Sequence, residues 1–146
     1  DKIIESSKFN QGFTTVEYLS AAILDLDWHT VNQIADIDVN QFEKNSLDKM
    51  GLIPQIVVRY RSTYFKHIFS SSYASGYYSY IWAEVIEADT YEAFQEKGIF
   101  DPATAQSLRD NILSKGGTID PMQMFINFRG REPEISALLK RRGLEG

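Results

Sequence analysis

Residues 64–89 read YFKHIFSSSYASGYYSYIWAEVIEAD, and they hold one of the chain's two histidines and five of its eight tyrosines. Small residues allow a backbone to approach a ligand closely. A phenol or an imidazole can hydrogen-bond a ligand while it packs against it. Most aromatic clusters, however, serve the core. The stretch therefore has two interpretations, a packed interior or a surface that binds a ligand.

A helical pattern begins within this stretch and continues past it. It predicts a helix from about Gly76 to Lys97, and Gly98 is typical of the residue that follows a helix. If residues 73–80 also belong to that helix, two sets of aromatic side chains compete for the core. The set that presents a row of hydroxyls to a ligand or to water is Tyr73, Tyr77 and Tyr80. The set predicted to lie in the core is Tyr78, Trp82 and Val85, with Ile81 between them.

Two more helices are predicted before this stretch. Thr14 and Glu17 form a capping-box pair ahead of an apolar run, which predicts a helix from about residue 15 to 30. Asp38 is predicted to cap a second helix that ends near Met50, before Gly51. The apolar, β-branched residues 52–65 are compatible with an irregular connector or a short strand.

Proline marks the start of three further helices. Asp101-Pro102, Asp120-Pro121 and Pro133 are typical of helix starts. The predicted ends are Gly116-Gly117, Phe128 and Gly143. We therefore expect one all-α domain over residues 1–146, a compact bundle of about six helices.

The composition narrows the class of partner. A chain of 146 residues with 43% hydrophobic residues can form one ordinary core. Its net charge of −5 argues against nucleic acid, which is bound by clustered Lys and Arg. No apolar run approaches the roughly 20 residues that span a bilayer, so no membrane contact is expected. The basic residues near the end, interpreted as cations of a last helical turn, are Arg129, Arg131, Lys140, Arg141 and Arg142.

The chain has no cysteine, which excludes disulfides, thiolate metal sites and a cysteine nucleophile. This composition fits the cytoplasm and leaves the periplasm open. Asp25, Asp27 and His29 occur together in LDLDWH, and Asp25 and His29 share a helical face. A metal site needs a further ligand, so we interpret this trio as a polar helix face. The serines near His67 are a weak signal for a nucleophile, because triads are assembled from distant segments.

The motifs of residues 64–94 closely resemble the thimet oligopeptidase and peptidyl-dipeptidase family of zinc metallopeptidases, which includes oligopeptidase A. The matching pattern is Phe65-x-His67, then Tyr73, Tyr77-Tyr78-Ser79-Tyr80 and Trp82. The spacing of His67 to Tyr73 is most similar to the peptidyl-dipeptidase branch. Residues 8–29 and 107–144 resemble the family's preceding and closing segments, including Gly116-Gly117 and Phe128-Arg129-Gly130-Arg131. The resemblance covers nearly the whole chain.

The resemblance implies roles for the residues of the first motif. The residue matching Tyr80 would hydrogen-bond the oxyanion of the tetrahedral intermediate. His67 and Tyr73 would hold the peptide main chain, and Tyr77 belongs to the same candidate substrate-binding set. This chain departs from the family at Ser70-Ser71-Ser72, where relatives carry glycines, and serine restricts the backbone more than glycine.

The family's zinc ligands come from an HExxH helix and a later glutamate, and neither is present here. The resemblance places them upstream of Asp1, so the zinc cofactor belongs to the full-length enzyme and none is expected in this chain. We expect the C-terminal portion of a larger, mostly helical peptidase of short peptides, inactive alone, with a docking surface through which it could dimerise. The alternative is a free-standing helical module that binds a peptide or a protein.

Overall fold

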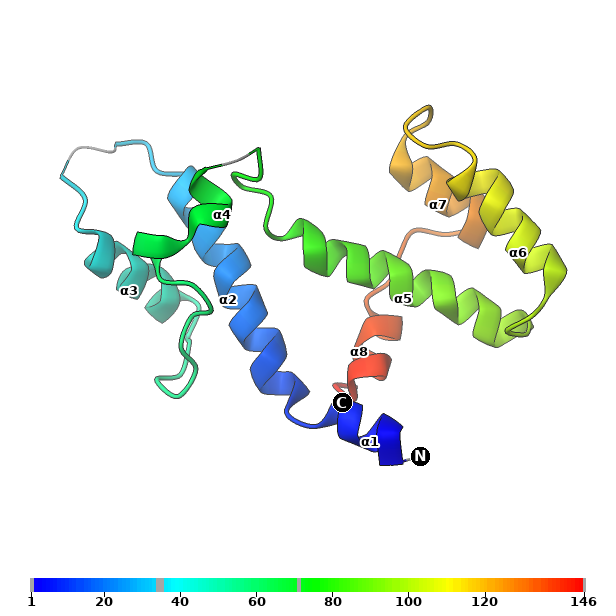
Figure 1. The fold of residues 1–146 in the computed structure, drawn as a ribbon, viewed down its shortest axis with the longest axis horizontal. Coiled ribbons are helices and arrows are strands. Elements are labelled where there is room, and N and C mark those ends of the chain that lie inside the picture. The colour runs from blue at the N-terminus through cyan, green and yellow to red at the C-terminus, as the bar shows by residue number, and fades with distance from the viewer. Residues whose placement is uncertain (1, 34–35, 71, 146) are drawn as a thin grey trace. The chain divides into compact units, whose positions relative to one another are not determined.

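The structure, a computed structural model, describes residues 2–33, 36–70 and 72–145. All regular elements within these ranges are helical, which confirms the predicted all-α class. The α-helices of Figure 1 are α1 Lys2–Lys8, α2 Gln11–His29, α3 Val39–Lys49, α4 Lys66–Phe69, α5 Ser79–Lys97, α6 Pro102–Leu108, α7 Pro121–Arg129 and α8 Ser136–Arg142. They are joined by a 3-10 helix, η1 Ser62–Tyr64, and a π-helix, η2 Arg109–Leu113. The prediction of about six helices missed α1 and α4.

The chain divides into two compact units, residues 1–81 and residues 82–146. In the first unit, α2 contributes two alanines to the core, and their small side chains allow later segments of the unit to pack closely against the helix. The buried cluster consists of Ala21, Ala22, Phe65, Ile68 and Tyr77. Phe65, Ile68 and Tyr77 therefore pack on α2, and this packing positions His67 and Tyr73, which lie between them in the sequence.

The start of α2 differs from the prediction. The helix begins at Gln11, after Asn10 in a left-handed conformation with φ 58°, and Asn10 makes no side-chain cap. Thr14 lies inside the helix, where its hydroxyl donates to the carbonyl oxygen of Asn10 at 3.3 Å. The predicted capping box of Thr14 and Glu17 is therefore wrong, because the preceding turn already continues the helix.

Three aspartates cap helices as predicted. Asp38 accepts hydrogen bonds from two backbone N–H groups at the start of α3. Asp101 and Asp120 each accept one, at the starts of α6 and α7, and each is followed by proline. The last helix begins at Ser136, three residues after Pro133. Residues 52–61 form an irregular connector, so the strand alternative for this segment is wrong.

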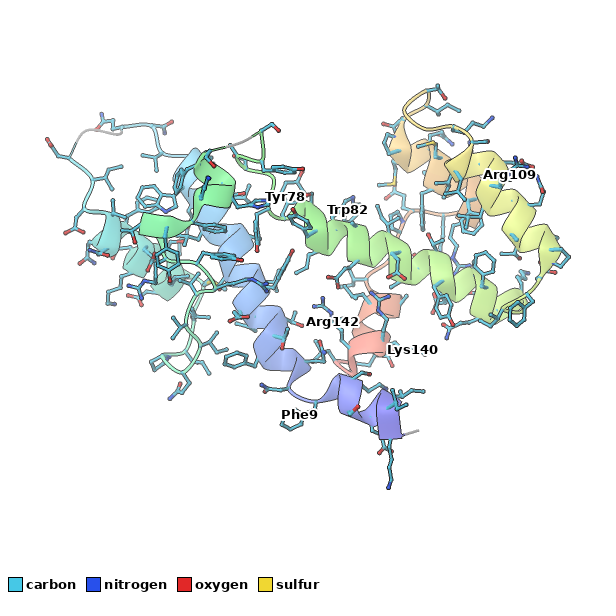
Figure 2. All side chains as sticks on the ribbon, in the orientation of Figure 1. Phe9, Tyr78, Trp82, Arg109, Lys140 and Arg142 are labelled. Atoms are coloured by element: carbon cyan, nitrogen blue, oxygen red, sulfur yellow. The ribbon has the colours of Figure 1, made fainter. Side chains whose placement is uncertain are left out.

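Helix α5 begins at Ser79, which places Tyr73 and Tyr77 in the turns before it. Val85 is buried, as predicted. Tyr78 and Trp82, both labelled in Figure 2, are 50% and 41% exposed, so their assignment to the core is wrong. Because the helix does not extend back to residue 73, the two helical faces assumed for these aromatic residues do not exist.

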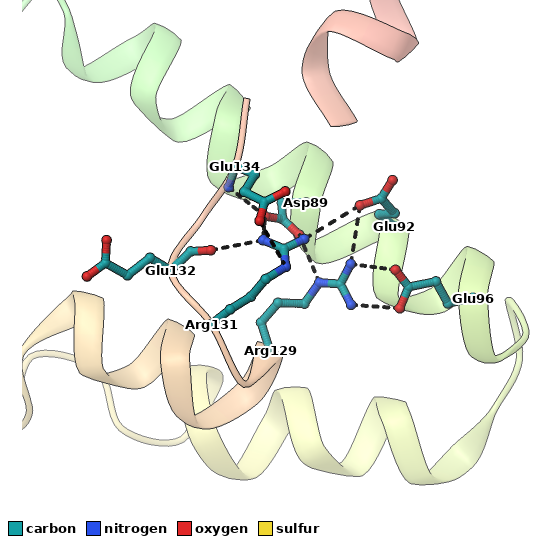
Figure 3. Close-up of polar contacts among 7 residues, drawn as sticks. All are labelled: Asp89, Glu92, Glu96, Arg129, Arg131, Glu132 and Glu134. Carbon is teal, nitrogen blue, oxygen red and sulfur yellow. Dashed lines mark hydrogen bonds and ion pairs between the residues drawn. The ribbon is translucent and has the colours of Figure 1, made fainter. Parts of the chain in front are cut away.

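A buried carboxylate organises the second unit (Figure 3). Asp89 of α5 is fully buried and accepts hydrogen bonds from the guanidinium groups of Arg129 and Arg131 and from the backbone N–H of Glu134. Arg129 also pairs with Glu92 and Glu96, which lie on α5 together with Asp89. The end of α7 and the segment after it are thereby attached to α5 by five charged side chains and one backbone N–H group.

Four residues of the predicted basic cluster, the arginines, pair with acidic side chains of α5. Arg141 and Arg142 occupy the last turn of α8, as predicted, and they pair with Glu87 and Glu84. No helix of the described residues is long and apolar enough to cross a membrane.

Candidate functional site

Four side chains from residues 67–80 gather in one group of rings. His67 lies on α4, and its ring centroid is 5.0 Å from Tyr73, 5.5 Å from Tyr77 and 5.9 Å from Tyr80. The Nε2 atom of His67 lies 3.3 Å from the hydroxyl oxygen of Tyr80. All four predicted site residues therefore come together, although α5 supplies only Tyr80.

The four members differ in their access to solvent. Tyr73 is 49% exposed, Tyr80 is 41% exposed and His67 is half-buried. Tyr77 is only 6% exposed, and its ring packs edge-on against Phe65 with the centroids 5.2 Å apart. Tyr77 thus forms the buried bottom of the group. The other three members have polar atoms that can reach a ligand.

The environment of Tyr77 keeps its phenol neutral at ordinary pH. Burial raises the pKa of the Tyr77 hydroxyl, and the positive charge of Arg59 opposes this shift without reversing it. The Arg59 guanidinium lies 5.9 Å from the ring centroid of Tyr18, and Tyr18 in turn packs against Tyr77 at 5.4 Å. A cation therefore lies next to the aromatic group on the side of α2.

The loop before α5 depends on two consecutive residues. Ser75 has φ 57°, a left-handed conformation that a residue with a side chain rarely adopts. At Gly76, a Cβ atom would lie 3.0 Å from the carbonyl oxygen of Tyr73, which accepts a hydrogen bond from the N–H of Gly76 at 2.9 Å. Ser70 donates to the carbonyl oxygen of Lys66, and Ser71 lies outside the described residues.

Asp25 of α2 binds this loop. Its carboxylate is fully buried and accepts from the backbone N–H of Ser75 at 3.1 Å and from that of Tyr77 at 2.9 Å. The Nδ1 atom of His29 lies 2.9 Å from the same carboxylate. The interpretation of Asp25 as part of a polar helix face is therefore wrong. The error arose because its partners lie 50 and 52 residues away in the sequence, where no local pattern indicates them.

The described residues contain no group of three or more His, Asp or Glu side chains that could hold a metal ion. The donors in the described part of the chain therefore do not fit a zinc site. What the group of rings offers is a phenol, an imidazole and a second phenol above an apolar base. Such a group can hydrogen-bond a polar ligand and pack against it at the same time.

Comparison with known proteins identifies the family. The profile of Peptidase family M3 matches residues 1–144. The chain belongs to Peptidase family M3. This confirms the family inferred from the motifs of residues 64–94.

Several named proteins are similar in sequence to this chain, over its whole length or over about half of it. The dipeptidyl carboxypeptidase of Salmonella typhimurium is 38% identical over 147 residues, which are 99% of this chain and 22% of that protein. Oligopeptidase A of Haemophilus influenzae is 55% identical over 80 residues, which are 55% of this chain and 12% of that protein. Saccharolysin of Saccharomyces cerevisiae is 30% identical over 99% of this chain and 20% of its own length. The chain thus spans about a fifth of the relatives that it matches throughout.

Proposed function

We propose that this chain forms the substrate-binding wall of an M3 zinc peptidase that hydrolyses short peptides. The observation that carries the proposal is the contact of Tyr80 with His67, in a partly exposed group of rings, within a chain of this family. The names of the relatives, dipeptidyl carboxypeptidase and oligopeptidase A, support a peptide as the substrate. The enzyme hydrolyses either an internal peptide bond of the substrate or the bond that releases a terminal dipeptide.

Tyr80 is proposed as the donor that stabilises the oxyanion. Its phenol is partly exposed and has one hydrogen to give, which suits a single oxygen that gains charge during the reaction. When His67 carries a proton on Nε2, it donates to the oxygen of Tyr80, and the phenol hydrogen is left for the substrate. A hydrogen bond received by the phenol oxygen also makes its own O–H a stronger donor.

His67 and Tyr73 are proposed to hold the main chain of the peptide. Their rings pack against each other, and the exposed half of Tyr73 gives a peptide group both an apolar surface and a hydroxyl. Tyr77 is proposed to take part in substrate binding mainly by packing beneath His67 and Tyr80, because its ring is buried. Contacts to the main chain favour correct orientation of the peptide over selection of its side chains.

The zinc that activates water in such a peptidase is proposed to be held by residues outside these 146. The chain alone is then inactive, and a longer product of the same gene carries the activity. We propose the cytoplasm as the compartment. One relative, 35% identical over 98% of this chain, is named a probable cytosolic oligopeptidase A.

The test is hydrolysis of a quenched fluorescent peptide in the presence of zinc, measured for the longer gene product and for this chain alone. Tyr80→Phe is expected to lower kcat by about 100- to 1,000-fold with little change in KM, because one oxyanion donor is lost. Tyr91→Phe removes the same hydroxyl from another partly exposed tyrosine and is expected to keep the wild-type kcat. Hydrolysis by the chain alone, or full activity of Tyr80→Phe, would refute the proposal.

A further inference from the structure

The carboxylate of Asp25 is bound on both oxygens. Oδ1 accepts from the N–H of Ser75 and lies 2.9 Å from Nδ1 of His29, and Oδ2 accepts from the N–H of Tyr77. Nδ1 of His29 is also 2.8 Å from the carbonyl oxygen of Asp25. Because both of these partners are acceptors, Nδ1 carries a proton. A buried carboxylate is stable only when such donors replace water, and here three donors do so.

These hydrogen bonds fix the part of the loop that determines the site geometry. Ser75 is held in its left-handed conformation, and Tyr77 is held two residues before α5 begins. The ring of Tyr77 then contacts both His67 and Tyr80, with centroids 5.5 Å and 5.6 Å away. The distance between the hydroxyl of Tyr80 and His67 therefore depends on where Asp25 holds the backbone.

We propose that Asp25 is a positioning residue of the active site, and that His29 orients it. Asp25 is buried behind the loop, so it acts through Ser75 and Tyr77 and touches no substrate. Its effect on the reaction passes through the placement of Tyr80. This inference rests on the proposed function, in which Tyr80 donates to the oxyanion.

Asparagine at position 25 is the sharpest substitution, because it has the same shape as aspartate and only one acceptor oxygen. In either orientation of the amide, its NH2 group faces a backbone N–H, that of Ser75 or that of Tyr77. One donor is then unpaired and opposed by another donor. The change disturbs the loop while leaving the volume of the buried site constant.

The matched control is Asp27→Asn, two residues along the same helix. The Asp27 carboxylate accepts from the hydroxyl of Ser46 in α3 at 2.7 Å, so it makes a partly buried contact of its own. Its carboxylate makes no hydrogen bond to the described residues of the loop before α5. The control thus separates a general loss of stability from a specific loss at the loop.

The experiment measures peptide hydrolysis by the full-length enzyme and amide hydrogen exchange in the same samples. Asp25→Asn is expected to accelerate exchange at Ser75 and Tyr77 by about tenfold or more, the equivalent of losing one hydrogen bond to a charged group. It is expected to lower kcat by about tenfold and to leave KM within about twofold. Asp27→Asn is expected to change neither the exchange of those two amides nor kcat.

A double-mutant cycle tests whether Asp25 acts through Tyr80. In the background of Tyr80→Phe, Asp25→Asn is expected to lower kcat by less than about twofold, because the hydroxyl that it positions is already absent. An equal loss in both backgrounds would overturn the proposal, as would unchanged exchange at Ser75 and Tyr77. His29→Gln leaves the carboxylate in place and is expected to give a smaller increase in exchange and a smaller loss of kcat. It replaces Asp25→Asn in the experiment if that variant does not fold.

The outcomes also separate this inference from the proposed function. If Tyr80→Phe has the wild-type kcat, the oxyanion role of Tyr80 fails. Faster exchange at Ser75 and Tyr77 in Asp25→Asn would then still show that Asp25 holds the loop. Slow exchange together with a reduced kcat would instead show that Asp25 acts elsewhere.

Discussion

At the scale of single residues, Ser75 and Gly76 of the loop before α5 fit their positions for different physical reasons. Ser75 adopts the left-handed conformation that glycine adopts most readily, and the hydrogen bond to Asp25 offsets the cost. Gly76 is favoured for space, because a Cβ atom there would lie only 3.0 Å from the carbonyl oxygen of Tyr73 and would require that backbone to shift. The position of Tyr73 against His67 thus depends on one missing methyl group.

Gly76→Ala is expected to destabilise the first unit by about 1–3 kcal/mol, because the added Cβ would force the backbone of Tyr73 away. Gly12→Ala is the matched control. Gly12 lies in α2 with open space around it, so alanine is expected to stabilise the helix by about 0.5–1 kcal/mol. Urea unfolding of the three proteins checks both signs, and a neutral or stabilising Gly76→Ala would contradict the close contact.

The sequence indicates which residues form the group of rings better than it indicates what surrounds them. His67, Tyr73, Tyr77 and Tyr80 lie within 14 positions of each other and match a family motif, so they could be named in advance. Asp25 could not, because its hydrogen bonds join segments about 50 residues apart. The condition of a continuous helix over residues 73–80 does not hold either, since α5 begins at Ser79 and Asp25 binds the backbone N–H groups of Ser75 and Tyr77 in the turns before it.

At the scale of elements, helix ends were predicted well where the signal is local. The caps at Asp38, Asp101 and Asp120 act within three residues of themselves. The start of α2 was missed because Asn10 begins the helix without a side-chain cap. The short α4 was missed because a helix of four residues has no periodicity to detect.

A buried link between elements of the second unit is the pairing of Asp89 with Arg129 at the end of α7 and with Arg131 after it. Although burial acts to raise the pKa of Asp89, the hydrogen bonds from Arg131, Arg129 and the N–H of Glu134 outweigh it and lower the pKa below the ordinary value of 3.8. A carboxyl with a lowered pKa in the folded state stabilises that state when it is ionised. This stabilisation is complete above about pH 5 and is lost as the pH falls through 3.8 to the lower pKa of the folded state.

Asp89→Asn is expected to destabilise the second unit by about 3 kcal/mol at pH 7, because two arginines lose a buried charged partner. Glu87→Gln is the control, since Glu87 pairs with Arg141 at an exposed site, where such pairs contribute less than about 1 kcal/mol. Denaturant unfolding at pH 7 and pH 3 checks the prediction. The deficit of Asp89→Asn should shrink at pH 3, and a constant deficit would contradict the ionic origin.

At the scale of the whole molecule, the chain exposes many large apolar side chains for its size. The most exposed, at 60% or more, are Ile3, Ile4, Phe9, Val57, Tyr64, Phe100, Leu113 and Ile135. Both units contribute to this set, and Phe9, labelled in Figure 2, lies between α1 and α2. Relatives that match this chain throughout are about five times as long, so we expect these side chains to be covered if the chain forms part of a longer protein.

The chain alone is therefore expected to self-associate, because several exposed apolar side chains gain free energy on burial and one phenylalanine contributes about 1.5–3 kcal/mol. Phe9→Glu and Phe100→Glu are each expected to weaken association by about tenfold or more, which corresponds to about 1.4 kcal/mol. Gln55→Glu adds the same charge at an exposed polar position and is expected to leave association unchanged. Sedimentation velocity over a concentration series measures all four proteins. A monomer at every concentration would show that these side chains need no cover, and an equal effect of Gln55→Glu would assign the association to charge.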